Sequence, residues 1–524
     1  MADLLDRPSL PSADEKKVAS TNVFSDVQLT PVTTTTTPDG TGRLRALKGW
    51  LSPRHHDTAW AKFLRFFTFL GPGAIISVAY IDPDNYQVAI SAGGSFQFKL
   101  LFMVLVSNMI AVYLQSLSIK LGTVTGMDLA QMNHRYLPRW LELSIYAIAE
   151  ACIICTDLGQ VIGTAIALNM LIPQIPLPAG CVISVAETLL ILIFYNNRGE
   201  LRRIRVFEIF IAVLVLTIFV VICVALGMIK APVGQVFRGY VPSREIFVGT
   251  GLYESCAILG GTLMPHAFYL GTALTRARLH DFDVKNNLTP TSSPASSTES
   301  FYRPSLRAIK ACLHYSIAEL AFTLFTVAVF VNSALLVISG SAFYDPYAGD
   351  DTDDNGGPKI SGDLYDIYNL FSDTIAPAAG ILFAVSLLFS GISAGIVATM
   401  AGQIVMEGAL NIRLSPFLRR LVTRCVAIIP ALIIAASLGQ EGLSQALVAG
   451  NYILAVGLIF ITFPVVWYTC FSKYMQVPTD DGTATVDLKN NWPTAIVAWI
   501  IWLLVVVMDI ATIVLIGLGL ADDD

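Results

Sequence analysis

The sequence predicts an all-α membrane protein that crosses the bilayer about eleven times. Of its 524 residues, 54% are hydrophobic and only 14% are charged, whereas soluble globular proteins carry about 25% charged residues. The apolar residues form continuous blocks that exceed the ~20 residues a helix needs to cross the hydrocarbon layer. Strands of a membrane barrel would alternate apolar and polar residues instead, so the predicted spans are helices.

The distribution of basic residues orients these spans. Arginine and lysine concentrate before the first span and after each even-numbered span, whereas the loop after the seventh span has only Lys359 among acidic residues. Because basic loops tend to stay on the cytosolic side, the N-terminus is predicted to be cytosolic. The predicted spans cover residues 63–94, 98–121, 141–172, 178–196, 205–230, 248–273, 309–340, 374–407, 419–438, 444–471 and 493–520.

Residues 1–60 differ from the rest of the chain because they are rich in Ser, Thr, Pro and charged residues. A segment of this composition cannot bury enough apolar surface to fold alone. It is predicted to be a disordered cytosolic tail and a candidate segment for trafficking factors. Residues 278–308 are similarly polar and are predicted to form a flexible loop. The eight cysteines are scattered and lie mostly within apolar segments, so no disulfide framework is expected.

Two of the apolar spans are interrupted by polar and helix-breaking residues. Residues 79–85 of the first span read Ala-Tyr-Ile-Asp-Pro-Asp-Asn, and residues 260–266 of the sixth read Gly-Gly-Thr-Leu-Met-Pro-His. Proline removes a backbone donor and pushes the preceding residue out of the helical region, so each insertion should unwind its helix. Each break lies in the first helix of a five-span half, which is typical of transporters with inverted repeats and a site near the bilayer midplane.

Ordinary proline kinks are the alternative explanation for both breaks, because such kinks occur in many membrane helices. The first break, however, also carries the carboxylates of Asp82 and Asp84. A charged side chain at the bilayer centre costs at least ~2.5–3.5 kcal/mol. Two such carboxylates therefore need a partner or a function, which favours a binding site.

If the two breaks face each other, they bring a mixed set of donor atoms together. Carboxylate and amide oxygens suit many divalent ions, whereas a thioether favours later transition metals over Mg²⁺ and Ca²⁺. One charge, several neutral oxygens and one sulfur predict a site for Mn²⁺ or Fe²⁺, although a lone methionine in an apolar helix is more often a packing residue. The donors are Asp82, Asn85, Met264 and free carbonyls near Ala79 and Gly261.

Residues 79–85 and 264–270 resemble two motifs of the Nramp family of proton-coupled divalent metal transporters. The family's first-helix motif reads DPGN, and its sixth-helix motif begins MPH. Segments 115–129, 161–171, 401–408 and 419–424 are also similar to this family, nearest its fungal Smf-type members. The similarity covers about residues 60–475, nearly the whole predicted membrane part.

The resemblance implies a secondary active transporter that moves Mn²⁺ or Fe²⁺ into the cytosol with protons. It implies a LeuT-like ten-helix core in residues 61–475, with inverted repeats at about 61–231 and 247–472, and a linker with an added eleventh helix in 476–524. The metal would be a substrate bound by the donors named above, so neither a permanently bound cofactor nor an enzymatic activity is expected.

The resemblance also implies a proton route through Asp82, His266, Asp157 and Arg424. Histidine titrates near neutrality, although an isolated buried histidine is more often a core residue. Asp157 lies in the middle of the third span, where an unpaired carboxylate is costly. Arg424 is its candidate counter-charge, or alternatively extends to the membrane interface. Further candidate proton carriers are Glu150, Glu187, Glu254 and Glu319.

Five positions depart from the family pattern. Asp84 stands in place of glycine, Gln160 in place of a glutamate of the third span, and Gly271 in place of a histidine that often follows the sixth-helix motif. Gly261 replaces an alanine, and Gly457 replaces a glutamine of the tenth span. Because Gln160 and Gly271 cannot carry a proton, Asp84 is either a substitute proton carrier or a carboxylate that shifts the preference toward harder ions.

Two other functions stay open on the sequence. The same fold could carry an amino acid or another small organic solute, although Asp82 and Asp84 would repel a substrate carboxylate. A metal sensor that does not transport is the third hypothesis, and the altered third span gives it some weight. Expected partners are the metal, protons and the lipid bilayer, without nucleic acid. The topology is compatible with the plasma membrane, the vacuole or the endosome.

Overall fold

The computed structural model describes residues 80–184, 216–217, 219–229, 231–247, 249–286, 302–344, 363–374, 376–410, 416–479 and 484–517. The chain divides into two units, Met1–Ala61 and Lys62–Asp524, and every described residue belongs to the second. The predicted tail 1–60, Ala79, Glu187, most of the predicted span 178–196 and the first part of 205–230 lie outside the described residues.

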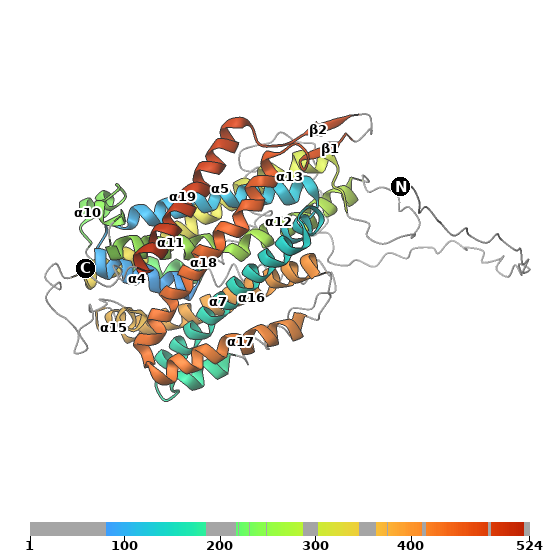
Figure 1. Cartoon of the computed structure of the whole chain (residues 1–524). Helices are drawn as coiled ribbons and strands as arrows, with labels where there is room; N and C mark the ends of the chain where they lie inside the picture. Colours follow the sequence, from blue (N-terminus) through green and yellow to red (C-terminus); the bar gives the residue numbers. More distant parts are fainter. Residues whose placement is uncertain are drawn as a thin grey trace, which may run out of the picture. The chain divides into compact units, whose positions relative to one another are not determined.

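Helices make up nearly all of the described structure (Figure 1). Helix α7 packs against α16, α17 and α18, and α4 packs against α11, α14 and α18. The helices are α4 Pro83–Phe96, α5 Leu101–Thr125, α6 Leu129–Tyr136, α7 Arg139–Leu171, α10 Val233–Gly239, α11 Gly249–Leu263, α12 Pro265–Lys285, α13 Leu306–Thr323, α14 Val329–Ala342, α15 Leu364–Thr374, α16 Pro377–Leu410, α17 Pro416–Ser437, α18 Gly439–Cys470 and α19 Trp492–Gly517, with a 3-10 turn η1 Arg244–Phe247 and a π turn η2 Leu324–Ala328.

Six helical segments of the described chain are long and apolar enough to cross a membrane. A seventh results if the bent pair Val233–Phe247 and Gly249–Lys285 counts as one span. These segments coincide with predicted spans, which confirms a polytopic helical membrane protein. The full count of about eleven stays a prediction. The six segments are Leu101–Thr125, Arg139–Leu171, Leu306–Ala342, Pro377–Leu410, Gly439–Cys470 and Trp492–Val514.

The sixth span is interrupted where the sequence predicted. Helix α11 ends at Leu263, Met264 has non-helical backbone angles, and α12 begins at Pro265. In the first span, α4 likewise begins at a proline, Pro83, with Asp82 as its N-cap. Proline suits the first position of a helix because its missing N–H would have no partner there. The same residue type therefore starts α4 and α12, and the part of the first predicted span before Tyr80 lies outside the described residues.

The polar loop predicted for residues 278–308 is shorter than expected. Helix α12 continues to Lys285, and α13 begins at Leu306. The extra helical turns are held by Asp283, whose carboxylate accepts hydrogen bonds from the backbone N–H and the hydroxyl of Ser305 at 3.1 and 2.6 Å. The polar composition of this stretch reflects these helix-end contacts as well as a connection between helices.

The predicted linker after residue 475 contains a short antiparallel hairpin. Strand β1, Gln476–Pro478, pairs with β2, Thr485–Asp487, so that Val477 lies opposite Val486. Beyond it, the backbone N–H of Asn490 donates to the carbonyl of Thr469 at 2.9 Å. This contact fixes the hairpin to the end of α18 before α19 begins.

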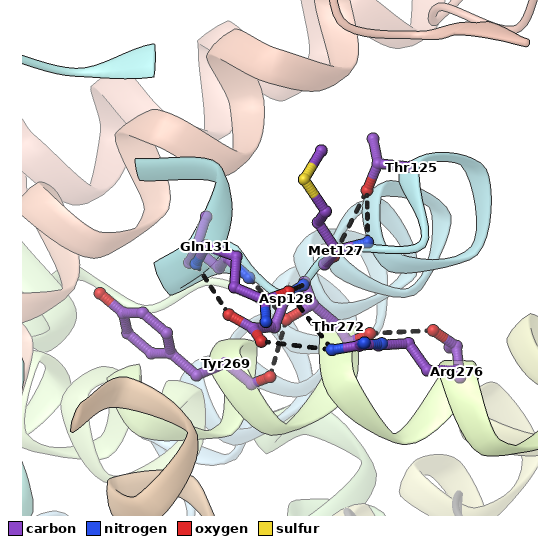
Figure 2. A network of polar contacts seen from close by, with 9 residues as sticks. Thr125, Met127, Asp128, Gln131, Tyr269, Thr272 and Arg276 are labelled. Carbon is purple, nitrogen blue, oxygen red and sulfur yellow. Dashed lines mark hydrogen bonds and ion pairs between the residues drawn. The ribbon is translucent and has the colours of Figure 1, made fainter. Parts of the chain in front are cut away.

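A polar network joins the middle of α12 to α6, as Figure 2 shows. Asp128 caps α6 by accepting from the backbone N–H of Gln131 at 2.8 Å, and the Gln131 side chain accepts from the N–H of Asp128 at 3.2 Å. From α12, Thr272 accepts from the N–H of Leu129 at 3.0 Å. Arg276 donates to Gln131 at 3.3 Å and lies 3.8 Å from the Asp128 carboxylate. We refer to Asp128, Gln131, Thr272 and Arg276 as the α6–α12 network.

Candidate functional site

The carboxylate of Asp82 is fixed at the start of α4 through one of its two oxygens. Its Oδ1 accepts from the backbone N–H of Asn85 at 2.9 Å, an N-cap contact of the usual kind. The other oxygen is buried and has no hydrogen-bond partner among the described residues. A buried carboxylate oxygen without a partner is costly, so this atom is available to a ligand.

Asn85 connects the two interrupted spans. Its side-chain N–H₂ donates to the carbonyl of Gly261 at 3.2 Å and to the carbonyl of Tyr80 at 3.4 Å. Those carbonyls belong to the segments just before the two breaks, which are far apart in the sequence. The breaks therefore meet, and the side chain of Asn85 lies between them. A Cβ at position 261 would lie 2.5 Å from the amide oxygen of Asn85, so a larger residue there would require the Asn85 side chain to shift.

Two further buried residues lie close to Gly261, Met264 three residues along the chain and Asn451 on α18. Met264 is fully buried and belongs to the same apolar cluster as Tyr80. Asn451, on α18, is also fully buried, and neither atom of its amide has a hydrogen-bond partner among the described residues. Its Oδ1 lies 2.9 Å from the position that a Cβ of Gly261 would take. Asn451 is not among the residues predicted from the sequence, although an amide within the apolar residues of the tenth span was a usable signal.

The first turn of α4 lies in a groove on α7 that small residues create. A Cβ on Gly159 would lie 1.9 Å from a carboxylate oxygen of Asp84, and a Cβ on Gly163 would lie 2.4 Å from Pro83. Glycine on α7 thus lets the two helices approach closely, as small residues do in membrane proteins. The Asp84 carboxylate consequently lies against Gly159, immediately before Gln160 in the sequence.

A chain of polar contacts leads from α12 across α7 to α17. The Nδ1 atom of His266, in the first turn of α12, lies 3.5 Å from the hydroxyl of Thr156 on α7. One residue further on α7, the carbonyl of Asp157 accepts from Arg424 at 3.2 Å, and Gln160 accepts from the same guanidinium at 3.4 Å. Arg424 is 1% exposed. The alternative in which Arg424 extends to the membrane interface was therefore wrong.

Three glutamates named as candidate proton carriers have partners outside this chain of contacts. Glu150 on α7 pairs with Arg419 at 2.7 Å. Glu319 on α13 pairs with Arg278 at 2.8 Å. Glu254 on α11 accepts from the hydroxyl of Ser91 at 2.8 Å. These contacts explain why the three glutamates are tolerated in the apolar helices. The partners of Glu150 and Glu319 do not belong to the junction of the two breaks.

Neighbouring side chains occupy the space at two of the altered positions. A Cβ on Gly271 would lie 2.8 Å from the amide oxygen of Gln115. The amide nitrogen of Gln115 donates to the carbonyl of Ala267 at 2.9 Å. A Cβ on Gly457 would lie 2.2 Å from the sulfur of Cys152. Cys152 is thus a packing residue, and neither position has room for a larger side chain in this arrangement.

The donor atoms at the junction differ from those of a carboxylate, histidine or thiolate metal centre. The described part of the chain contains no group of three or more His, Cys, Asp or Glu side chains suited to a metal ion. What the junction offers is one carboxylate oxygen of Asp82, the amides of Asn85 and Asn451, the carbonyl of Gly261 and the thioether of Met264. Neutral oxygens, one negative charge and one sulfur are donors that suit a divalent transition metal.

A buried polar junction between the interrupted sixth span and the start of α4 is the arrangement expected of a membrane transporter of the broken-helix class. The sequence model of the family described as "Nramp: Natural resistance-associated macrophage protein-like" matches residues 73–515. The chain belongs to the Nramp family. Members of this family are transporters, in line with the expectation that the protein is not an enzyme.

Individual relatives support the same assignment. The chain is 45% identical over 463 residues to the manganese transporter pdt1 of Schizosaccharomyces pombe, with 86% of each chain covered. It is 41% identical over 433 residues to the iron transporter SMF3 of Saccharomyces cerevisiae, covering 82% of this chain and 86% of that one. The crystal structure of the Eremococcus coleocola manganese transporter aligns with a TM-score of 0.70 and 26% identity, covering 90% of this chain and 95% of that chain.

Proposed function

We propose that this protein is a secondary active transporter that carries Mn²⁺ or Fe²⁺ into the cytosol together with protons. The observation that carries the proposal is the contact of Asn85 with the carbonyl of Gly261, at 3.2 Å, beside the unpartnered oxygen of Asp82. It supports a single binding point made from both interrupted spans. Relatives described as manganese and iron transporters support the choice of metals.

The proposed metal ligands are Asp82, Asn85, Met264 and the carbonyl of Gly261, with the amide of Asn451 as an addition. The predicted carbonyl ligand of Ala79 stays a proposal, because that residue lies outside the described residues. Asp82 supplies the charge, and the amide and carbonyl oxygens replace water. The thioether of Met264 raises the preference for transition metals over Ca²⁺ and Mg²⁺.

The proposed proton route follows His266, Thr156, Asp157 and Arg424. Asp157 is the group assigned to carry the proton, because it is fully buried in α7 and its backbone carbonyl contacts Arg424. His266 connects this path to the metal site.

Asp84 and Gln160 are proposed to modify this route together. In the family pattern the third span carries a glutamate where this chain has Gln160. The carboxylate of Asp84 lies against Gly159, next to that position. We infer that the negative charge has moved from α7 to the first turn of α4, so that the path keeps a carboxylate although α7 has lost one.

The orientation and setting of the transporter follow from the basic loops. We place the N-terminus in the cytosol, so that transport runs from the outer or luminal face inward. The plasma membrane and the vacuolar or endosomal membrane both fit this orientation. Residues 1–60 are the segment proposed to bind trafficking factors.

Uptake of radiolabelled Mn²⁺ into proteoliposomes under an inward proton gradient tests the proposed function. Wild-type protein should accumulate Mn²⁺, Asp82→Ala should not, and Met264→Ala should become sensitive to competing Ca²⁺. The exposed acidic residue Asp373 on α15 offers a matched control, Asp373→Asn, which should transport as wild type does. Accumulation of a labelled amino acid instead of Mn²⁺ would establish the organic-solute alternative, and binding without flux would establish the sensor.

A further inference from the structure

Helix α19 contains a single ionisable residue in an otherwise uncharged membrane helix. The residue is Asp509, which lies about 12 Å from the C-terminal end of α19 by helical rise. It shares the buried face of α19 with Ala498, Val505 and Thr512, whereas the opposite face is exposed and apolar. The carboxyl group is therefore inside the protein and within the apolar span Trp492–Val514, five residues before its end.

The Asp509 carboxyl has no partner for either oxygen. The side chain is 2% exposed, and both Oδ atoms lack a hydrogen-bond partner among the described residues. Helix α19 packs against α11 and α18. None of these three helices contains Lys, Arg or His, so no basic side chain on them can neutralise an ionised carboxylate.

The groups around Asp509 are weak acids. On α11, the thiol of Cys256 lies 3.0 Å from the hydroxyl of Thr512 and within electrostatic range of Asp509. On α18, Tyr452 is also within that range, and its hydroxyl has no hydrogen-bond partner among the described residues. Tyr253 stacks on Tyr452 with ring centroids 4.4 Å apart.

The acidic side chain of α11, Glu254, does not bring a positive charge to Asp509 either. Glu254 accepts a hydrogen bond from Ser91 and has a second, buried oxygen without a partner among the described residues. A divalent metal is not favoured here, because the described chain has no suited group of three or more His, Cys, Asp or Glu. An unpaired charge in a membrane interior is strongly disfavoured. The ligand that fits one carboxyl among neutral donors is a proton.

We propose that Asp509 is a proton-binding site separate from the metal site, located where α19 contacts the α11 segment of the interrupted sixth span. In the packed arrangement described here the carboxyl holds a proton. When the contact between α11 and α19 opens to water, the ionised form is hydrated and the proton leaves. Low pH therefore favours the packed arrangement, and α11 carries this preference to Gly261 at the metal site.

Infrared spectroscopy of the full-length protein in lipid bilayers tests the proposal directly. At neutral pH the wild-type protein should show the carbonyl stretch of a protonated carboxyl group. In Asp509→Asn this band should be weaker by the intensity of one carboxyl group. Asp373→Asn, which removes an exposed carboxyl, should match wild type. Asp509→Glu, which keeps the acid, should restore the band at a shifted frequency. Identical carboxyl bands in wild type and Asp509→Asn would overturn the proposal.

Labelling of Cys256 provides a second measurement that does not depend on metal transport. Mass spectrometry reports the modification of each thiol by a soluble maleimide, and Cys152, buried against Gly457, serves as internal reference. The ratio of Cys256 to Cys152 labelling should rise several-fold with pH in wild type and stay constant in Asp509→Asn. An equal rise in both proteins would contradict the proposal. Failure of Mn²⁺ uptake would leave both readouts interpretable, because neither requires transport.

Discussion

The α6–α12 network and the junction around Asn85 differ in how their buried polar side chains are paired. In the α6–α12 network every side chain is paired with another member or with the backbone (Figure 2). At the junction, the second oxygen of Asp82 and the whole amide of Asn451 are buried without partners among the described residues. Buried polar groups without hydrogen bonds are costly. A bound ion could complete the unpartnered groups at the junction, whereas the α6–α12 network is already complete without one.

Replacing one carboxylate by an amide in each region, at Asp82 and at Asp128, gives the largest expected difference in Mn²⁺ uptake. Asp82→Asn keeps an N-cap side chain but removes the charge, so Mn²⁺ uptake should fall by more than ~100-fold, beyond the usual cost of changing an outer-shell partner. Asp128→Asn removes an ion pair with a half-buried arginine, so uptake should fall by less than about fivefold. Initial rates in proteoliposomes measure both. Equal losses at the two positions would remove the distinction between site and structural contact.

The contact of α4 with α7 can be tested by adding a methyl group at Gly159 and by removing the side chain of Asp84. Gly159→Ala places a methyl group 1.9 Å from the Asp84 carboxylate, so it should destabilise the protein by about 1–3 kcal/mol through overpacking. In an Asp84→Gly background the same substitution should cost much less, because the clashing group is gone. Apparent Tm values of the four proteins give the coupling. Additive effects would show that Asp84 does not lie against Gly159.

The sequence predicted the junction well because local chemistry determines it. Pro83 and Pro265 each start a helix after a break, and those breaks could be located from residue type alone. The resemblance to a known family then assigned roles to Asp82, Asn85 and Met264. The contact between Asn85 and Gly261 confirms that the two breaks meet. Whether these groups bind metal stays a prediction.

The remaining features depend on which helix faces which, and a single sequence does not contain that information. Asn451 lies in an apolar span, and only the packing of α18 against α11 brings it to Gly261. The closeness of Asp84 to Gly159 requires a glycine groove on a different helix. Asp509 was not among the predicted site residues, because α19 lies outside both predicted repeats. In each case the functional interest comes from a contact between distant segments rather than from a motif.

Moving the carboxylate back to α7 tests the inferred exchange between Asp84 and Gln160. Asp84→Gly alone should lower proton-driven Mn²⁺ uptake by roughly tenfold, within the range for residues next to a metal site. Adding Gln160→Glu should restore most of that loss, because α7 regains a negative charge beside the same path. Gln160→Glu alone is the matched control, and uptake with and without a proton gradient is the measurement. Absence of rescue in the double variant would mean that the two positions serve separate roles.

The smallest expected effect concerns the pH dependence of the α6–α12 network. Burial raises the pKa of Asp128, which lies between α5 and α6, from 3.8 to about 6, although the backbone N–H of Gln131 and the guanidinium of Arg276 oppose this rise. The native protein then binds more protons at this position than the unfolded chain between those values, so stability should fall as pH rises from about 4 to 6, by on the order of 2 kcal/mol. Asp128→Asn keeps the cap and should lose this slope, whereas Asp373→Asn should keep it. Apparent Tm measured across this pH range decides the matter, and an unchanged slope in Asp128→Asn would assign the proton uptake to another group.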